Sequence, residues 1–216
     1  RKNYNSVFVH MNQIYVILGG LFWRLTGKKI SLWYAHGSVS LSLRLAEKLA
    51  HNIFTSTKSG FRIDSKKINV VGQGIDTDLF SLKNNNRNEK FEIISIGRIS
   101  PVKDYETLIE AVGILSEENI NVTIIGDASL GEHEKYFSNL RKAVRDKGLE
   151  GRIHFVGGMP NSDIVKYLQK SDLFINTSHT GSLDKAILEA MSVGLPILTC
   201  NEALLEVFGE YKERLM

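Results

Sequence analysis

Short apolar runs alternate with amphipathic stretches along most of this chain of 216 residues. Runs rich in Val, Ile and Phe predict strands, and stretches with apolar residues at helical spacing predict the connections between them. In the second half, the expected strands are residues 91–97, 121–126, 152–157, 172–176 and 195–200, and the expected helices lie near 104–117, 132–147, 161–170 and 183–193. Strands and helices that alternate in this way indicate βαβ units and a buried parallel sheet.

The first half shows the same pattern with fewer elements. Its expected strands are residues 6–10, 29–34, 52–57 and 67–73, and its expected helices lie near 12–26 and 38–50. Four strands with so little chain before them make a poor free-standing sheet, so we interpret residues 1–82 as the back half of a first α/β domain. The polar segment SLKNNNRNEK at 81–90 reads as a linker to a second domain at 91–216. The predicted fold class is α/β, with two Rossmann-like parallel-sheet domains, the first incomplete.

Two cations follow the first strand of the second half. In GRISPVKDYETLIEA, Arg98 and Lys103 flank a turn, and a helix is expected to begin near Asp104. Right-handed crossovers bring the carboxyl ends of these strands to one edge of the sheet, where ligands bind. A basic pair in a loop more often consists of solvent-exposed side chains that bind no ligand. At this edge, beside a helix N-terminus, the pair instead predicts a phosphate or diphosphate site.

Other common site motifs are missing or incomplete in the sequence. The segment IIGDASLGE has Gly126 but lacks the later glycines of a dinucleotide fingerprint, and the chain has no P-loop. His36 ends an expected strand and precedes Gly37 and Ser38. A structural role and a site role explain this histidine equally well.

The turn after the expected strand 172–176 carries more polar chemistry than a connection requires. It contains His179, Thr180, Gly181 and Ser182 before the next helix. Ser182 is expected to cap that helix, and Gly181 would let a ligand approach the backbone closely. The backbone amides of Leu183 and Asp184 are then expected to donate to sugar or phosphate oxygens.

The net charge of +3 conceals an asymmetry between the two halves. Residues 1–85 carry 12 Lys/Arg and 4 Asp/Glu, a net +8, whereas residues 86–216 carry 15 and 20, a net −5. This difference indicates an anionic partner for the first half, although a solvated basic surface explains it equally well. The single cysteine, Cys200, excludes an intrachain disulfide, and no Cys/His clusters have zinc spacing.

The apolar run IYVILGGLFW at 14–23 ends at Arg24, too early for a membrane span. A buried core helix is the more frequent explanation of such a run, and contact with an anionic membrane is the alternative. The single cysteine makes the reducing cytoplasm the expected compartment. No secretory signal is present, and the first residue is Arg1 rather than Met. We also expect the chain to be a fragment of a longer protein.

Three segments carry a family resemblance. GRISPVKDYETLIEAV, FVGGMP and SLDKAILEAMSVGLPIL, in this order and spacing, resemble the second domain of the retaining glycosyltransferases of family four. That family has the GT-B architecture of two Rossmann-like domains facing across a cleft. VVGQGIDTDLF resembles the segment that joins its domains, and YAHG resembles its strand-end histidine. The resemblance covers nearly the whole chain and is looser before residue 29. The segments that would match the family's first strand, its glycine-rich loop and its C-terminal helix are absent from this sequence.

The resemblance implies roles for individual residues. Arg98 and Lys103 match cations that hold the donor's diphosphate, and Glu189 matches the carboxylate that binds the ribose hydroxyls. Met159 in the FVGGMP loop matches the segment lining the base, and His36 matches a histidine near the anomeric centre. The catalytic residues so implied are His36, Arg98 and Lys103. The donor-binding residues are Gly97, Arg98, Lys103, Gly126, Gly158, Met159, Gly181, Ser182, Leu183, Asp184, Leu188 and Glu189.

The chain departs from the family at Gly181, where a glutamate usually contacts the hydroxyls of the donor sugar. Either the site is degenerate, or the turn at 179–184 binds the sugar differently. We favour the second explanation, in which Asp184 is the nearest carboxylate that could replace the missing contact. Asp184 could instead simply favour the positive end of the helix.

The function implied by the resemblance is transfer of a sugar, with retained configuration, from a nucleotide-diphosphate sugar to a glycan or lipid-linked acceptor in polysaccharide or glycolipid assembly. The alternatives are a GT-B sugar-nucleotide epimerase or phosphorylase, and a non-catalytic module that binds sugar nucleotides. We expect no cofactor, no metal requirement and no nucleic-acid partner. The expected location is the cytoplasm, with peripheral contact at the inner face of an anionic membrane, and the fragment alone is expected to be inactive.

Overall fold

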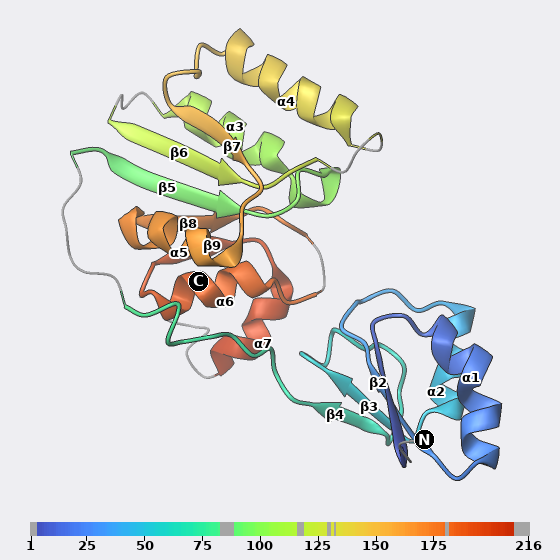
Figure 1. The fold of residues 1–216 in the computed structure, drawn as a ribbon. Coiled ribbons are helices and arrows are strands. Elements are labelled where there is room, and N and C mark those ends of the chain that lie inside the picture. The colour runs from blue at the N-terminus through green and yellow to red at the C-terminus, as the bar shows by residue number, and fades with distance from the viewer. Residues whose placement is uncertain are drawn as a thin grey trace. The chain divides into compact units, whose positions relative to one another are not determined.

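The computed structural model describes residues 4–82, 89–115, 119–128, 131, 133–179 and 182–209. They fall into two compact units, the first made mainly of residues up to Gln73 and the second mainly of Gly74–His179 and Asp184–Asn201. Each unit contains one sheet in which every named strand pair is parallel (Figure 1). The two parallel-sheet α/β regions predicted from the sequence are therefore confirmed.

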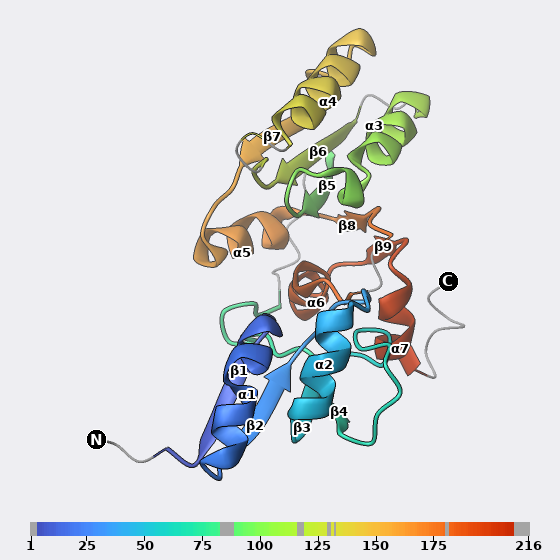
Figure 2. The ribbon, with the colours of Figure 1, turned by 90° about the vertical axis from the view of Figure 1, so that its right-hand side faces the viewer.

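In the first unit, the sheet has the strand order β1-β2-β3-β4. Its elements are β1 (Ser6–His10), α1 (Ile14–Leu25), β2 (Lys29–Trp33), α2 (Leu41–Leu49), β3 (Asn52–Thr55) and β4 (Ile68–Val70). Helices α1 and α2 lie side by side on one face of the sheet (Figure 2). The core between helices and strands includes Val9, Val16, Ile30, Leu32, Leu43, Ala46, Ile53 and Phe61.

Helix α1 is not the buried core helix that the sequence predicts. Its buried residues are Val16 and Gly20, which form a narrow contact face. The other apolar side chains are exposed, and Leu18 and Leu25 reach 76% and 87% exposure. The exposed set is Ile14, Tyr15, Leu18, Leu21, Phe22 and Leu25. The helix is apolar on more than one side, and the described residues cover only one of these sides.

In the second unit, β5 lies at the centre of the strand order β7-β6-β5-β8-β9. The strands are β5 (Phe91–Ile96), β6 (Ile120–Ile125), β7 (Ile153–Gly157), β8 (Leu173–Asn176) and β9 (Ile197–Thr199). The helices are α3 (Tyr105–Ile114), α4 (Glu134–Asp146), α5 (Asn161–Lys170) and α6 (Lys185–Ser192), with a 3₁₀ turn, η1 (Pro101–Lys103), before α3. The strand order reverses between β5 and β8, and ligands of open α/β sheets bind at such a point.

The second unit is built in three layers. Helices α3 and α4 pack on the sheet through a core that includes Leu108, Ile109, Val112, Leu140 and Val144. Helices α5 and α6 lie on the opposite side of the sheet (Figure 2). Both faces are therefore covered, which explains why residues 93–96 of the central strand β5 are all buried, rather than every second one.

Every strand and helix expected in the two domains is present, with ends that differ by a few residues. The chain continues after β9 with η2 (Glu202–Leu204) and α7 (Leu205–Phe208). Residues 83–88 of the predicted linker lie outside the described residues, so the linker and the domain boundaries stay predictions. No helix in the described part of the chain is long and apolar enough to cross a membrane.

Candidate functional site

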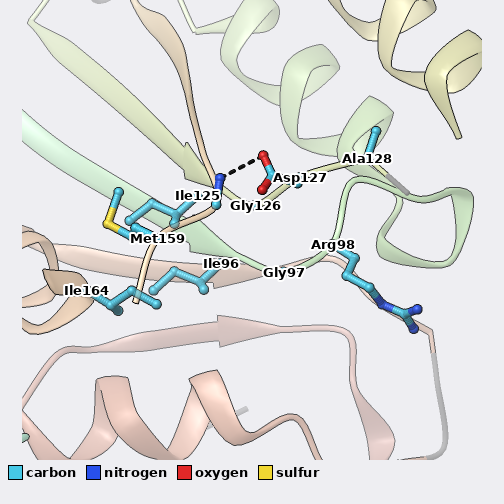
Figure 3. Close-up of a pocket in the computed structure, with 10 residues that line it drawn as sticks. Ile96, Gly97, Arg98, Ile125, Gly126, Asp127, Ala128, Met159 and Ile164 are labelled. Atoms are coloured by element: carbon cyan, nitrogen blue, oxygen red, sulfur yellow. Dashed lines mark hydrogen bonds between the residues drawn. The ribbon is translucent and has the colours of Figure 1, made fainter. Parts of the chain in front are cut away.

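A pocket of about 380 Å³ lies at the carboxyl edge of the second sheet, among the loops that follow β5, β6 and β7 (Figure 3). Its lining residues are Ile96, Gly97, Arg98, Ile125, Gly126, Asp127, Ala128, Gly158, Met159 and Ile164. Its volume falls within the range of small-molecule sites. The lining combines apolar side chains with glycine backbone, a surface suited to a planar ring.

Gly126 brings two of these loops into direct contact. A Cβ at this position would lie 1.9 Å from the carbonyl oxygen of Gly97, and the φ of +154° further disfavours a side chain. The Gly97 amide donates to the Ile125 carbonyl at 2.9 Å, and the Gly126 amide donates to the Gly157 carbonyl at 3.0 Å. The glycine therefore allows three strand ends to meet at one wall of the pocket.

Tyr105 is hydrogen-bonded to the same wall of the pocket. Its hydroxyl donates to the Gly97 carbonyl at 2.8 Å, and the side chain is fully buried. Burial raises the pKa of the Tyr105 hydroxyl far above its usual range, and the Asp184 carboxylate adds to the increase. The phenol therefore remains a proton donor at physiological pH and fixes the Gly97 carbonyl.

Asp127 is a pocket residue that sequence reasoning missed. Its Oδ1 accepts the Gly158 amide at 2.8 Å (Figure 3). A Cβ at position 158 would lie 2.2 Å from the other carboxylate oxygen, so a side chain there would displace the carboxylate from this position. The signal in the sequence was an acid directly after the strand-end glycine in IIGD, but its partner lies 31 positions away.

The two predicted cations are in different surroundings. Arg98 is exposed, and its side chain extends away from the apolar part of the pocket (Figure 3). It makes no ion pair with any other described residue, so its guanidinium can meet an anion at the rim. The Lys103 side chain is 14% exposed, and its Nζ lies 2.5 Å from Asp184 Oδ2. The sequence did not predict this pair.

The turn before α6 differs from the prediction. Helix α6 begins at Lys185, so Asp184 occupies the N-cap position and the predicted Ser182 cap is wrong. The Asp184 side chain makes no capping hydrogen bond, because its carboxylate faces Lys103 instead. Ser182 and Leu183 are half-buried, while Thr180 and Gly181 lie outside the described residues.

Glu189, the predicted ribose ligand, is buried in α6 with 3% of its surface exposed. Its Oε1 accepts Asn161 Nδ2 at 3.1 Å and lies 3.1 Å from Lys185 Nζ. These two partners stabilise the carboxylate, and the sequence analysis missed both. Neither Glu189 nor its neighbour Leu188 lines the pocket.

His36 belongs to the first unit, in the loop that follows β2. Its Nδ1 accepts the Ser38 amide at 3.1 Å, and its own amide donates to the Gly60 carbonyl at 2.9 Å. An acceptor role for Nδ1 places the proton of the neutral ring on Nε2. The exposed ring therefore offers an N–H donor to a ligand.

Among the described residues, no group of three or more His, Cys, Asp and Glu side chains is placed to hold a metal ion. The chemistry that this site can offer with its own residues is electrostatic. It consists of a cationic rim and of carboxylates held in ion pairs or by amide donors.

Three comparisons bear on the identity of the chain. The family model "Glycosyl transferases group 1" matches residues 76–215. The amylovoran biosynthesis glycosyltransferase AmsK of Erwinia amylovora is 32% identical over 148 residues, which are 64% of this chain and 35% of that protein. A UDP-Gal:α-D-GlcNAc-diphosphoundecaprenol α-1,3-galactosyltransferase of Escherichia coli is 29% identical over 153 residues, covering 64% of this chain and 38% of that protein. The chain thus spans little more than a third of the length of these relatives.

The solved structures show the fold. Anabaena HepE in complex with UDP-glucose superposes with a TM-score of 0.80 at 20% identity, covering 98% of this chain and 67% of that one. A sucrose-phosphate synthase from Thermosynechococcus elongatus gives a TM-score of 0.77 at 13% identity, covering 93% and 57%. The predicted GT-B-like fold is confirmed. Because the family model matches more than half of the residues, the chain belongs to the glycosyl transferases group 1 family.

Proposed function

We propose that the whole protein transfers a sugar, with retained anomeric configuration, from a nucleotide-diphosphate sugar to a glycan or lipid-linked acceptor in the assembly of a polysaccharide or glycolipid. The observation that carries this proposal is the pocket at the carboxyl edge of the second sheet, with Arg98 at its rim and Lys103 at the end of η1, the 3₁₀ turn before α3. AmsK and the galactosyltransferase are named for comparable assembly reactions, and HepE was solved with UDP-glucose.

The electrostatics of the reaction support this assignment. Cleavage of a glycosyl–diphosphate bond leaves negative charge on the departing phosphate. Fixed cations and helix N-terminal amides offset such charge with little reorganisation. We assign the diphosphate to Arg98 and Lys103, and the base to the apolar wall at Met159. Glu189 is assigned to the ribose hydroxyls.

The other proposed site residues are assigned to further contacts with the donor. Gly97, Gly126 and Gly158 expose main-chain atoms to the donor, because each lines the pocket without a side chain. His36 is assigned to the donor sugar through its Nε2–H. Ser182, Leu183 and Leu188 stay proposed donor contacts on the evidence of their family positions alone.

Incubation of the complete protein with labelled sugar nucleotides and candidate acceptors tests the function. We expect label in a larger glycan or glycolipid with the anomeric configuration of the donor. Release of free sugar, or conversion to an epimeric sugar nucleotide, would point to the alternative enzymes. Binding of donor with no turnover under any acceptor would point to a binding module.

We expect transfer to survive removal of divalent metals. The two cations can neutralise the diphosphate themselves, and the sequence has no Asp-x-Asp at the end of an expected strand. The rate of the complete enzyme should therefore be the same with and without EDTA. Loss of activity in EDTA that manganese restores would contradict this prediction.

We further propose that the first unit contacts an anionic membrane through α1. The exposed apolar residues of this helix lie beside Arg24, Lys28 and Lys29, in the half of the chain with a net charge of +8. Helices that lie in a membrane interface combine an apolar surface with basic flanks in this way. The acceptor of such an enzyme would then be reached at the inner face of the membrane.

Co-sedimentation with vesicles tests this contact. Basic residues contribute about 1 kcal/mol each near an anionic surface, so binding should exceed that to neutral vesicles and should weaken as salt is added. Leu18→Ser with Leu25→Ser should reduce binding. Leu198→Ser is the matched control, because Leu198 is 60% exposed in the second unit. Equal binding to anionic and neutral vesicles would rule the proposal out.

A further inference from the structure

The ammonium group of Lys103 is occupied before any donor binds. The proposed reaction requires this group at the diphosphate, yet Nζ lies 2.5 Å from Asp184 Oδ2. Both side chains are largely buried, with 14% and 22% of their surfaces exposed. The two residues are 81 positions apart, so the sheet edge brings them together.

Asp184 is itself held in place by the end of β8. Its Oδ2 accepts Asn176 Nδ2 at 3.0 Å and lies 3.4 Å from Ser178 Oγ, which donates to it. Asn176 is 3% exposed, and its Oδ1 accepts the Ser178 amide and Thr199 Oγ1, each at 3.3 Å. The amide orientation is fixed by these donors, and only its NH₂ can face the carboxylate.

Lys103 is held along its whole length. Its carbonyl accepts Thr177 Oγ1 at 2.8 Å, and its amide donates to the Ser100 carbonyl at 2.9 Å. The aliphatic stem passes directly over Gly97, since a Cβ there would lie 3.0 Å from Lys103 Cε. Gly97 lines the pocket, so the stem of Lys103 runs along the pocket's edge.

We propose that Asp184 is a positioning residue for Lys103 and acts on the donor through it. This inference rests on the proposed function. An ammonium group has three N–H donors, and Asp184 uses one of them, which leaves two for phosphate oxygens. The carboxylate also holds the long, largely buried side chain of Lys103 in one conformation.

This assignment differs from a direct contact between Asp184 and the donor sugar. Lys103, Asn176 and Ser178 all donate to Oδ2, so that oxygen is saturated. A positioning role predicts that the effect of Asp184 on a nucleoside diphosphate depends on Lys103. A sugar contact predicts an effect on transfer alone, because a nucleoside diphosphate carries no donor sugar.

Calorimetric titration of four proteins with UDP and with GDP separates these roles. The proteins are the unmodified chain, Lys103→Ala, Asp184→Asn and the double variant. With Lys103 present, Asp184→Asn should lower the affinity several-fold because the ammonium is no longer fixed. With Lys103 replaced, the same change should raise the affinity several-fold, because it removes an unpaired carboxylate near the diphosphate.

The reversal of sign is the expected result. A change by the same factor in both backgrounds, or no change in either, overturns the positioning role. Binding of neither nucleotide by the unmodified chain would instead contradict the proposed function, so the two failures are distinct. Urea unfolding of the same proteins must also show favourable coupling between the two residues, and its absence likewise overturns the inference.

Two controls exclude general effects. Uridine or guanosine without phosphates should bind all four proteins equally, because the pair is assigned to the diphosphate. Asp146→Asn removes a carboxylate that lies 2.6 Å from Lys142 Nζ on the surface of α4. It makes the same chemical change away from the pocket, and it should leave nucleotide affinity unchanged.

Discussion

Lys103→Ala is expected to weaken the binding of a nucleoside diphosphate about tenfold or more. A charge-assisted hydrogen bond to phosphate contributes about 1.5–3 kcal/mol, and about 1.4 kcal/mol corresponds to a tenfold change in affinity. The substitution also leaves the largely buried Asp184 carboxylate without its cation. The loss of nucleotide affinity should therefore exceed the loss that follows replacement of a surface lysine. Isothermal titration calorimetry with UDP or GDP measures it.

The same substitution should leave the affinity for the bare nucleoside unchanged, because the proposed function assigns the base and the ribose to other residues of the unit. Lys142→Ala is a matched control, since Lys142 pairs with Asp146 on the exposed surface of α4. It should change neither affinity. Equal losses for the nucleoside and its diphosphate in Lys103→Ala would show that the substitution disturbs the pocket rather than a phosphate contact.

The order of strands and helices could be predicted from the sequence because strands buried in a parallel sheet are rich in apolar residues. Strand β5 is apolar along most of its length. Helix α5 spans Asn161–Lys170, the same residues as the helix expected from the sequence. Helix α1 shows the limit of such patterns. Apolar residues predict a helix, but they do not tell what covers it, and Leu18 and Leu25 are exposed.

The sequence predicts those residues of the candidate site that lie at the ends of strands. Gly97, Gly126 and Gly158 come directly after strands or at their ends, so the topology alone brings them to one edge. Contacts between distant loops were not predictable. The pairs of Lys103 with Asp184 and of Asp127 with Gly158 depend on how the loops fold above the sheet.

The wrong helix cap has a related cause. A serine before a helix is a good N-cap by local preference, so Ser182 was the natural choice. The helix begins at Lys185 instead, and Asp184 is bound to Lys103. A tertiary ion pair thus takes precedence over a local signal.

Gly126→Ala is expected to destabilise the second unit by about 2–4 kcal/mol and to distort the pocket. The new Cβ would lie 1.9 Å from the carbonyl oxygen of Gly97, and the φ of +154° is unfavourable for alanine. Neither backbone can move aside easily. The Gly97 amide is bonded to Ile125 and the Gly126 amide to Gly157, so a shift would break contacts between β5, β6 and β7.

Gly148→Ala is the matched control for this prediction. Gly148 also has a positive φ, +66°, but no atom lies within 4 Å of the Cβ that alanine would add. Gly148→Ala should therefore cost only the conformational strain, about 1 kcal/mol. Urea unfolding gives both free energies, and UDP or GDP titration reports the pocket. We expect nucleotide affinity to fall in Gly126→Ala alone. If the two variants lose the same stability and bind nucleotide equally well, the close approach of the β5 and β6 loops does not shape this site.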